Sequence, residues 1–178
     1  MKNAFILGLQ YAGILIGVTI VAYGLGADIY FSFAFTAIGF VLSKYLIWHF
    51  GKTYRDKYRD GFVSFGQLFL PLMTIIFSGY VLGTLFQLLL MEVIDPEMKR
   101  LAMEAGLDQA ADIYKAIGMS DREIDKALDD AQELSAFMSI IQYVGGIVGG
   151  LFYSAFWAAI FGLLIRREKP FDPMTHQS

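Results

Sequence analysis

Cysteine is absent from this 178-residue chain, and histidine occurs only twice, at His49 and His176. The lack of thiols excludes disulfide bonds, a cysteine nucleophile and a cysteine-based metal site. The two histidines are far apart and do not indicate a metal cluster or a catalytic dyad. No P-loop or nucleotide fingerprint occurs either. We therefore expect no catalytic residue, no metal site and no cofactor, and we predict that the protein is not an enzyme.

Charged residues are also scarce and unevenly distributed. They make up 17% of the chain, against roughly 25% in soluble domains. About 20 apolar residues in a helix cross the hydrocarbon core of a bilayer. Four segments of at least this length are almost free of charge: residues 4–27, 29–49, 61–91 and 134–165. Lys44, in the second segment, is the single charged residue among them.

These segments predict an all-α fold, a bundle of four transmembrane helices that forms a single membrane domain over residues 1–178. A short helical insertion is expected between the third and fourth spans. The predicted spans are about residues 4–25, 28–50, 65–92 and 136–165.

A short basic segment, residues 51–64, separates the second and third spans and is predicted to be a loop. Lys and Arg residues that flank spanning helices stay on the cytoplasmic side, so this segment predicts cytoplasmic N- and C-termini. The loop cations also suit lipid headgroups, although topology alone explains their presence. The possible headgroup contacts are Lys52, Arg55, Lys57 and Arg59. The same side would hold Lys2, Lys44, Arg166, Arg167 and Lys169, which brings the total to nine of the fourteen basic residues.

The opposite side would carry an acidic segment, residues 93–135. Residues 92–133 hold twelve acidic and five basic residues, a local charge of −7. Caps and breakers predict two or three short amphipathic helices, which either fold over the mouth of the bundle or extend it as an antiparallel pair. The segment lacks the ligand spacing of an EF-hand. The expected boundaries are Asp95 with Pro96, a break at Gly106, a stop at Gly118, and a capping box of Ser120 with Glu123.

Glycine pairs four residues apart occur in three predicted spans. This GxxxG spacing lets two helix backbones approach closely, although glycine is also generally common in membrane helices. The pairs predict helix-packing surfaces, some of which would receive a protein partner or a second copy of the chain. They are Gly13 with Gly17, Gly79 with Gly83, Gly145 with Gly149, and Gly146 with Gly150.

Few polar side chains lie well inside the spans. Gln10, Gln87 and Gln142 are the large ones, and they would either line a polar path or hydrogen-bond between helices. Lys44 would either extend its ammonium group to the headgroups or act as a functional intramembrane cation.

Two stretches carry a resemblance to a known family. YRDGFVSFGQLF (58–69) enters the third span with Ser64 and Gln67 in capping-box positions, and GMSDREIDKAL (118–128) lies in the acidic segment. Together with the glycine-rich last span, they resemble DUF4199, a family of membrane proteins from Bacteroidetes. The resemblance covers essentially the whole chain and implies a four-span fold in the bacterial inner membrane. It supplies no activity and no site residues.

The function predicted from these observations is a non-enzymatic accessory or scaffold subunit of an envelope complex. The alternative is a small transporter or a lipid-handling membrane protein. The expected partners are the lipid bilayer and a protein partner or second copy bound at the glycine faces, with no nucleic acid.

Overall fold

The computed structural model describes residues 1–137 and 139–168, with the side chains of residues 131–144 excepted, and the regular elements in this part of the chain are all helices. In chain order they are α1 (Lys2–Leu25), α2 (Ala27–Tyr30), α3 (Phe33–Tyr58), α4 (Phe65–Leu89), the π-helical turn η1 (Leu90–Ile94), α5 (Pro96–Ala116), α6 (Asp121–Phe137) and α7 (Ser139–Ile165).

Among the described residues, four helices are long and apolar enough to cross a membrane, namely α1, α3, α4 together with η1, and α7. Their outward faces expose large apolar side chains; Phe33 and Phe152, for example, are 84% and 74% exposed. Hydrocarbon accommodates such a surface, whereas water does not. The chain is an all-α, multi-pass membrane protein, and the predicted four-span bundle is confirmed.

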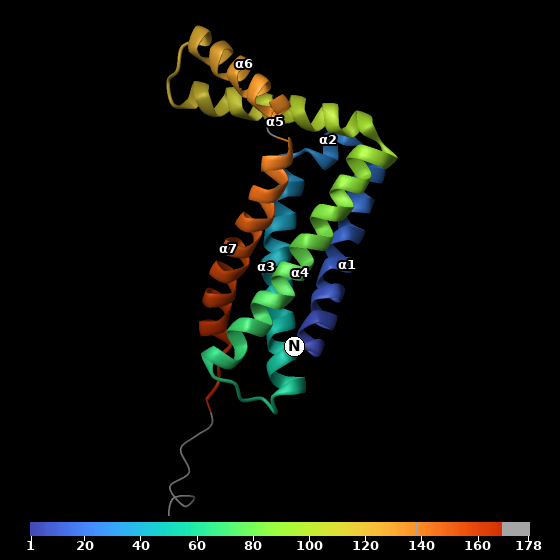
Figure 1. The fold of residues 1–178 in the computed structure, drawn as a ribbon, viewed down its shortest axis with the longest axis vertical. Coiled ribbons are helices and arrows are strands. Elements are labelled where there is room, and N and C mark those ends of the chain that lie inside the picture. The colour runs from blue at the N-terminus through green and yellow to red at the C-terminus, as the bar shows by residue number, and fades with distance from the viewer. Residues whose placement is uncertain (138, 169–178) are drawn as a thin grey trace, which may run out of the picture.

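Helix α4 is the central element of the bundle. It packs against α1 on one side and α7 on the other, and α3 makes smaller contacts with all three. Figure 1 shows the four long helices side by side, with α5 and α6 lying across one end. The opposite end, which we call the basic end, holds residues 52–59 and 166–167. The main core lies toward this end and includes the completely buried Leu68, Leu72 and Ile75.

The segment predicted as a loop, residues 51–64, is helical as far as Tyr58. The extension is explained by its buried face, because Gly51 and Tyr54 are buried although charged residues surround them in the sequence. A Cβ atom on Gly51 would lie 2.6 Å from Ile165 Cδ1 and 2.9 Å from Leu72 Cδ2, so α3, α4 and α7 meet here. Only residues 59–64 form the connection.

Backbone hydrogen bonds close the basic end. The chain turns at Asp60 and Gly61, both in the left-handed region (φ 53° and 79°). Val63 then exchanges hydrogen bonds of 2.7 and 3.0 Å with Arg167, which lies two positions after the last residue of α7. Ser64 N donates to Gln67 Oε1 at 3.3 Å, as the predicted capping box requires.

The acidic segment forms two helices. Helix α5 begins at Pro96 after the N-cap residue Asp95, and the turn that follows the helix contains Gly118 with φ 86°, as expected. The predicted break at Gly106 is wrong, because α5 continues through it. A helical glycine costs only about 1 kcal/mol relative to alanine, and the surrounding alanine, leucine and glutamate residues are strong helix formers.

Candidate functional site

A cavity of about 670 Å³ lies between α1, α3 and α4. It separates the main core from a second cluster of buried residues near α5, in which Ala22, Tyr30, Leu90 and Met98 pack together. The volume falls within the roughly 300–1,000 Å³ of typical ligand pockets. None of the described residues that line the cavity is acidic.

Helix α2 forms the wall nearest α5. Gly26, with φ 109°, ends α1 and lets the chain turn into α2, and the Ser32 hydroxyl then caps α3 by accepting from Phe35 N at 3.1 Å. The predicted second span, 28–50, is therefore divided into α2 and α3. This division places Tyr30 beside Phe31 and Phe35, with ring centroids 4.9 and 6.0 Å away.

The Tyr30 hydroxyl is the unusual group in this wall. Tyr30 is 7% exposed and lines the cavity, and its hydroxyl makes no hydrogen bond to any described residue. Most buried hydroxyl groups in proteins have a partner, since an unsatisfied buried donor costs about 1–3 kcal/mol. In the sequence, Tyr30 is only a tyrosine near the start of the predicted second span, 28–50, because the division of that span was not predictable.

Tyrosine residues also form the floor, which lies near the middle of the bundle. Tyr11 and Ser43 hydroxyls are hydrogen-bonded at 2.8 Å between α1 and α3. Tyr80 of α4 donates to the Gly146 carbonyl of α7 at 2.8 Å. Tyr153 of α7 completes the floor, with its ring centroid 6.5 Å from that of Tyr80.

Helix α5 forms the roof. Tyr23 of α1 donates to Asp95 Oδ2 at 3.0 Å, which fixes the start of α5 to the end of α1. Gly106 and Gln109 then face the cavity. Residues four positions apart share a helix face, so this face continues from Gln109 to Ile113 and Ile117, which are 62% and 69% exposed. Two arrangements were predicted for the acidic segment, and α5 adopts the one in which the segment folds over the mouth of the bundle (Figure 1).

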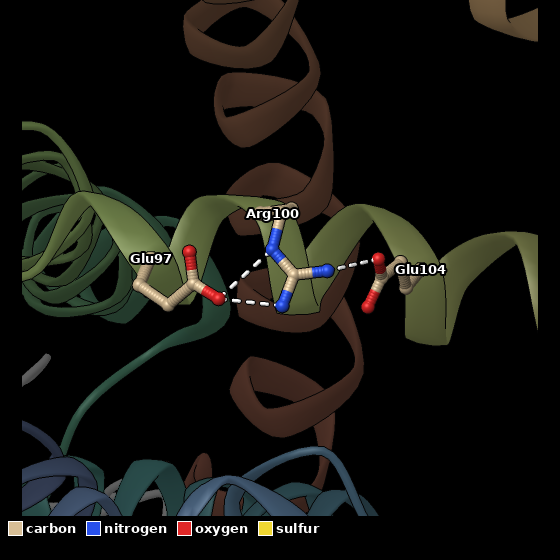
Figure 2. Close-up of polar contacts among 3 residues, drawn as sticks. All are labelled: Glu97, Arg100 and Glu104. Atoms are coloured by element: carbon tan, nitrogen blue, oxygen red, sulfur yellow. Dashed lines mark hydrogen bonds and ion pairs between the residues drawn. The ribbon is translucent and has the colours of Figure 1, made fainter.

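The charged side chains of α5 lie away from the cavity. Figure 2 shows Arg100 between Glu97 and Glu104, with its Nε 2.8 Å from Glu97 Oε1. The hydrogen bond from Arg100 holds the pKa of Glu97 below its usual value. These two ion pairs lie on an exposed surface of α5. Their i, i+3 and i, i+4 spacing is the one that stabilises isolated helices.

The cavity is open to one side. Thr36 of α3, Gln87 of α4 and Gln109 of α5 all line it and are exposed, so the opening lies between α3 and α4 below α5. Of the glutamines considered for a polar path, Gln87 lies at this rim and Gln10 is exposed elsewhere on α1. The Gln142 side chain lies outside the described ones.

The predicted glycine pairs serve different purposes. A Cβ atom on Gly79 would lie 2.2 Å from the Tyr11 ring, and one on Gly150 would lie 2.2 Å from the Tyr80 ring. A Cβ atom on Gly146 would lie 3.6 Å from the Tyr80 hydroxyl. Gly83 lines the cavity. The other four have no neighbour within 4 Å and are exposed: Gly13, Gly17, Gly145 and Gly149.

The four cations predicted to contact headgroups point in different directions. Arg55 Nη1 donates to the Ile165 carbonyl at 3.0 Å and so satisfies the end of α7. The Nζ atom of Lys52 lies 4.6 Å from the Trp48 ring centroid. Lys52 and Lys57 both line a shallow groove of about 350 Å³. Arg59 lies 6.0 Å from the Tyr54 ring. Binding of lipid headgroups stays a prediction, and the groove beside Lys52 and Lys57 is the surface that suits it best. Lys169, which was also predicted on this side, lies outside the described residues.

Among the described residues, no group of three or more His, Asp or Glu side chains is placed to hold a metal ion.

Comparison with sequence models of protein families gave a match over residues 3–167 to the family described as "Protein of unknown function (DUF4199)". Comparisons with curated proteins and with solved structures gave no significant match.

Proposed function

Because the chain belongs to the DUF4199 family, whose function is unknown, we propose its function from the geometry of the cavity. The protein is a lipid-handling membrane protein that binds an amphiphile between α1, α3 and α4. The observation that carries this proposal is the buried, unpartnered Tyr30 hydroxyl in the cavity wall. An uncharged polar group of the ligand, such as a hydroxyl or an ester oxygen, would remove the cost of the unsatisfied donor at this position.

The position of the opening supports an amphiphile over a water-soluble ligand. Thr36 and Gln87 lie within the apolar helices α3 and α4, so a molecule that enters between them comes from the bilayer. The lining alternates aromatic and aliphatic side chains with hydroxyl and amide groups. Such a surface accommodates a chain and a polar group together.

A second candidate is an accessory subunit of an envelope complex, favoured by the exposed glycines. Gly13 and Gly17 on α1, and Gly145 and Gly149 on α7, leave room for the backbone of another helix. These two surfaces could receive a protein partner or a second copy. Both candidates are compatible with one membrane domain.

One purification distinguishes these candidates. We expect the tagged protein, extracted in a mild detergent, to retain one enriched lipid class that mass spectrometry identifies. A stoichiometric protein that is lost from a Gly13→Leu, Gly17→Leu double variant would establish the accessory role. Absence of any enriched lipid, together with a retained protein, would refute lipid handling.

We also propose that the basic end is cytoplasmic in a bacterial inner membrane, which would place α5 and α6 outside. The support is the gathering of Lys52, Lys57 and Arg167 at this end and the acidic excess at the other.

The absence of cysteine makes this orientation testable. A single cysteine at Asp112 should react with an impermeant maleimide on spheroplasts, whereas one at Lys57 should react only after lysis. Labelling in the reverse order would show that the orientation is inverted.

A further inference from the structure

Lys44 lies about midway along α3, and its side chain is half-buried. It is the only charged residue between Asp28 and Lys52. At a rise of about 1.5 Å per residue it is roughly 12 Å along α3 from Lys52 and roughly 16 Å from Phe33. Ionisable residues at such depths are expensive, and they generally face a protein partner, a ligand or a cavity.

The ammonium group of Lys44 contacts three aromatic rings. Its Nζ lies 4.6 Å from the ring centroid of Phe40, 4.6 Å from that of Tyr153 and 3.8 Å from that of Trp157. It also donates a hydrogen bond to the Tyr153 hydroxyl. These three rings, which we call the aromatic cage, lie on α3 and α7. The aromatic cage therefore joins the two helices.

The aromatic cage supplies attraction but no negative charge. No described carboxylate forms an ion pair with Lys44, and the charge-free sequences of the other spans contain none at this depth. Cation–π contacts attract the ammonium group through the negative face of each ring, but they supply no counter-charge. The aromatic rings therefore leave the charge of this half-buried ammonium group without a counter-ion among the described residues.

Tyr153 connects this cation to the cavity. Its ring lines the cavity floor, and its hydroxyl accepts from Lys44. A hydroxyl that accepts one hydrogen bond still has its own proton to donate. The Tyr153 hydroxyl is therefore a donor that is polarised by an ammonium group. The Ser43 hydroxyl beside it, which is hydrogen-bonded to Tyr11, is the competing acceptor within the protein.

We propose that Lys44 and Tyr153 recognise the anionic headgroup, a carboxylate or a phosphate, of the bound amphiphile. The headgroup oxygens accept from Tyr153 and lie close to the Lys44 charge, while the apolar chain extends toward the opening between α3 and α4. This inference rests on the proposed function, because it names the class of molecule that the cavity binds.

The test compares matched ligands that differ only in the acid group. The purified full-length protein is titrated with oleic acid and with oleyl alcohol, and in parallel with lysophosphatidic acid and with monoolein, and binding is quantified by native mass spectrometry. We expect wild type to prefer the acid in at least one pair by about tenfold or more, as for hydrogen bonds to a charged group. The pair that shows the preference identifies the headgroup, and competition by inorganic phosphate would indicate a free anion as the source.

Variants assign the preference to these residues. Lys44→Met should remove it and leave the binding of the neutral ligands unchanged, and Tyr153→Phe should reduce it even if Lys44→Met does not fold. Lys52→Met, on the same helix at the basic end, should retain it. If wild type binds acid and neutral ligands equally, the inference is wrong while the proposed function stands. If wild type binds none of the four, the proposed function itself fails.

Discussion

Replacing Gly150 with alanine is expected to destabilise the bundle, whereas the same change at the adjacent Gly149 should not. The new Cβ at position 150 would lie 2.2 Å from Tyr80 Cε1, which forces the ring to move. That movement would also disturb the hydrogen bond from Tyr80 to the Gly146 carbonyl. Overpacking of this kind costs about 1–3 kcal/mol, and thermal unfolding of the purified protein in detergent measures it.

Gly149→Ala provides a matched control. It adds the same methyl group on the same helix, at a position with no neighbour within 4 Å. Alanine is favoured over glycine in helices by about 1 kcal/mol, so this variant should be as stable as wild type or slightly more stable. Equal unfolding temperatures for the two variants would show that Tyr80 does not pack on Gly150.

Replacing Gly83 with phenylalanine is expected to weaken ligand binding strongly without unfolding the protein. Gly83 lines the cavity, and a Cβ atom there meets nothing within 4 Å, so the new ring has room to enter. The ring would then occupy space that the ligand requires. We expect the enriched lipid to be lost on purification, with affinity reduced by about tenfold or more, since a steric clash removes several contacts at once.

Gly13→Phe is the control for this loss. Gly13 is equally free of neighbours but does not line the cavity. The variant should therefore keep the lipid and the unfolding temperature of wild type. Lipid retained by Gly83→Phe would place the binding site outside the cavity.

The spans were predictable because a bilayer imposes the same requirement on every sequence. Segments without charge over about 20 residues have few alternatives to a membrane helix. Their ends were less certain, since a helix continues past the bilayer wherever its buried face continues. Gly51 and Tyr54 extend α3 in this way, although the charges around them suggested a loop. Likewise, Gly106 alone did not indicate whether the helix would end there, because the residues around it decide whether α5 continues.

The cavity could not be predicted, because it depends on which helices meet. The pattern GxxxG is the same at Gly79 with Gly83 and at Gly13 with Gly17. One member of the first pair receives a tyrosine ring and the other borders empty volume, whereas both members of the second face outward. In the sequence, Tyr30 is one of several aromatic residues in the predicted second span, and only the separate helix α2 places it in the cavity wall. Lys44 was visible as an unusual charge, but its aromatic partners on α7 lie more than a hundred positions away.

The packing of α1 on α4 has a consequence for biosynthesis. Gly8 faces Ser78, with only 2.8 Å between a Cβ on the glycine and Ser78 Cβ, and the Tyr11 ring covers Gly79. Ser78 and Gly79, which make these two contacts with α1, are encoded after α3 and the connection at residues 59–64. The ribosome must complete α4 before Tyr11 has this partner, so the first spans enter the membrane as an unfinished pair. Assembly of the bundle is therefore coupled to the arrival of the third long helix rather than proceeding span by span.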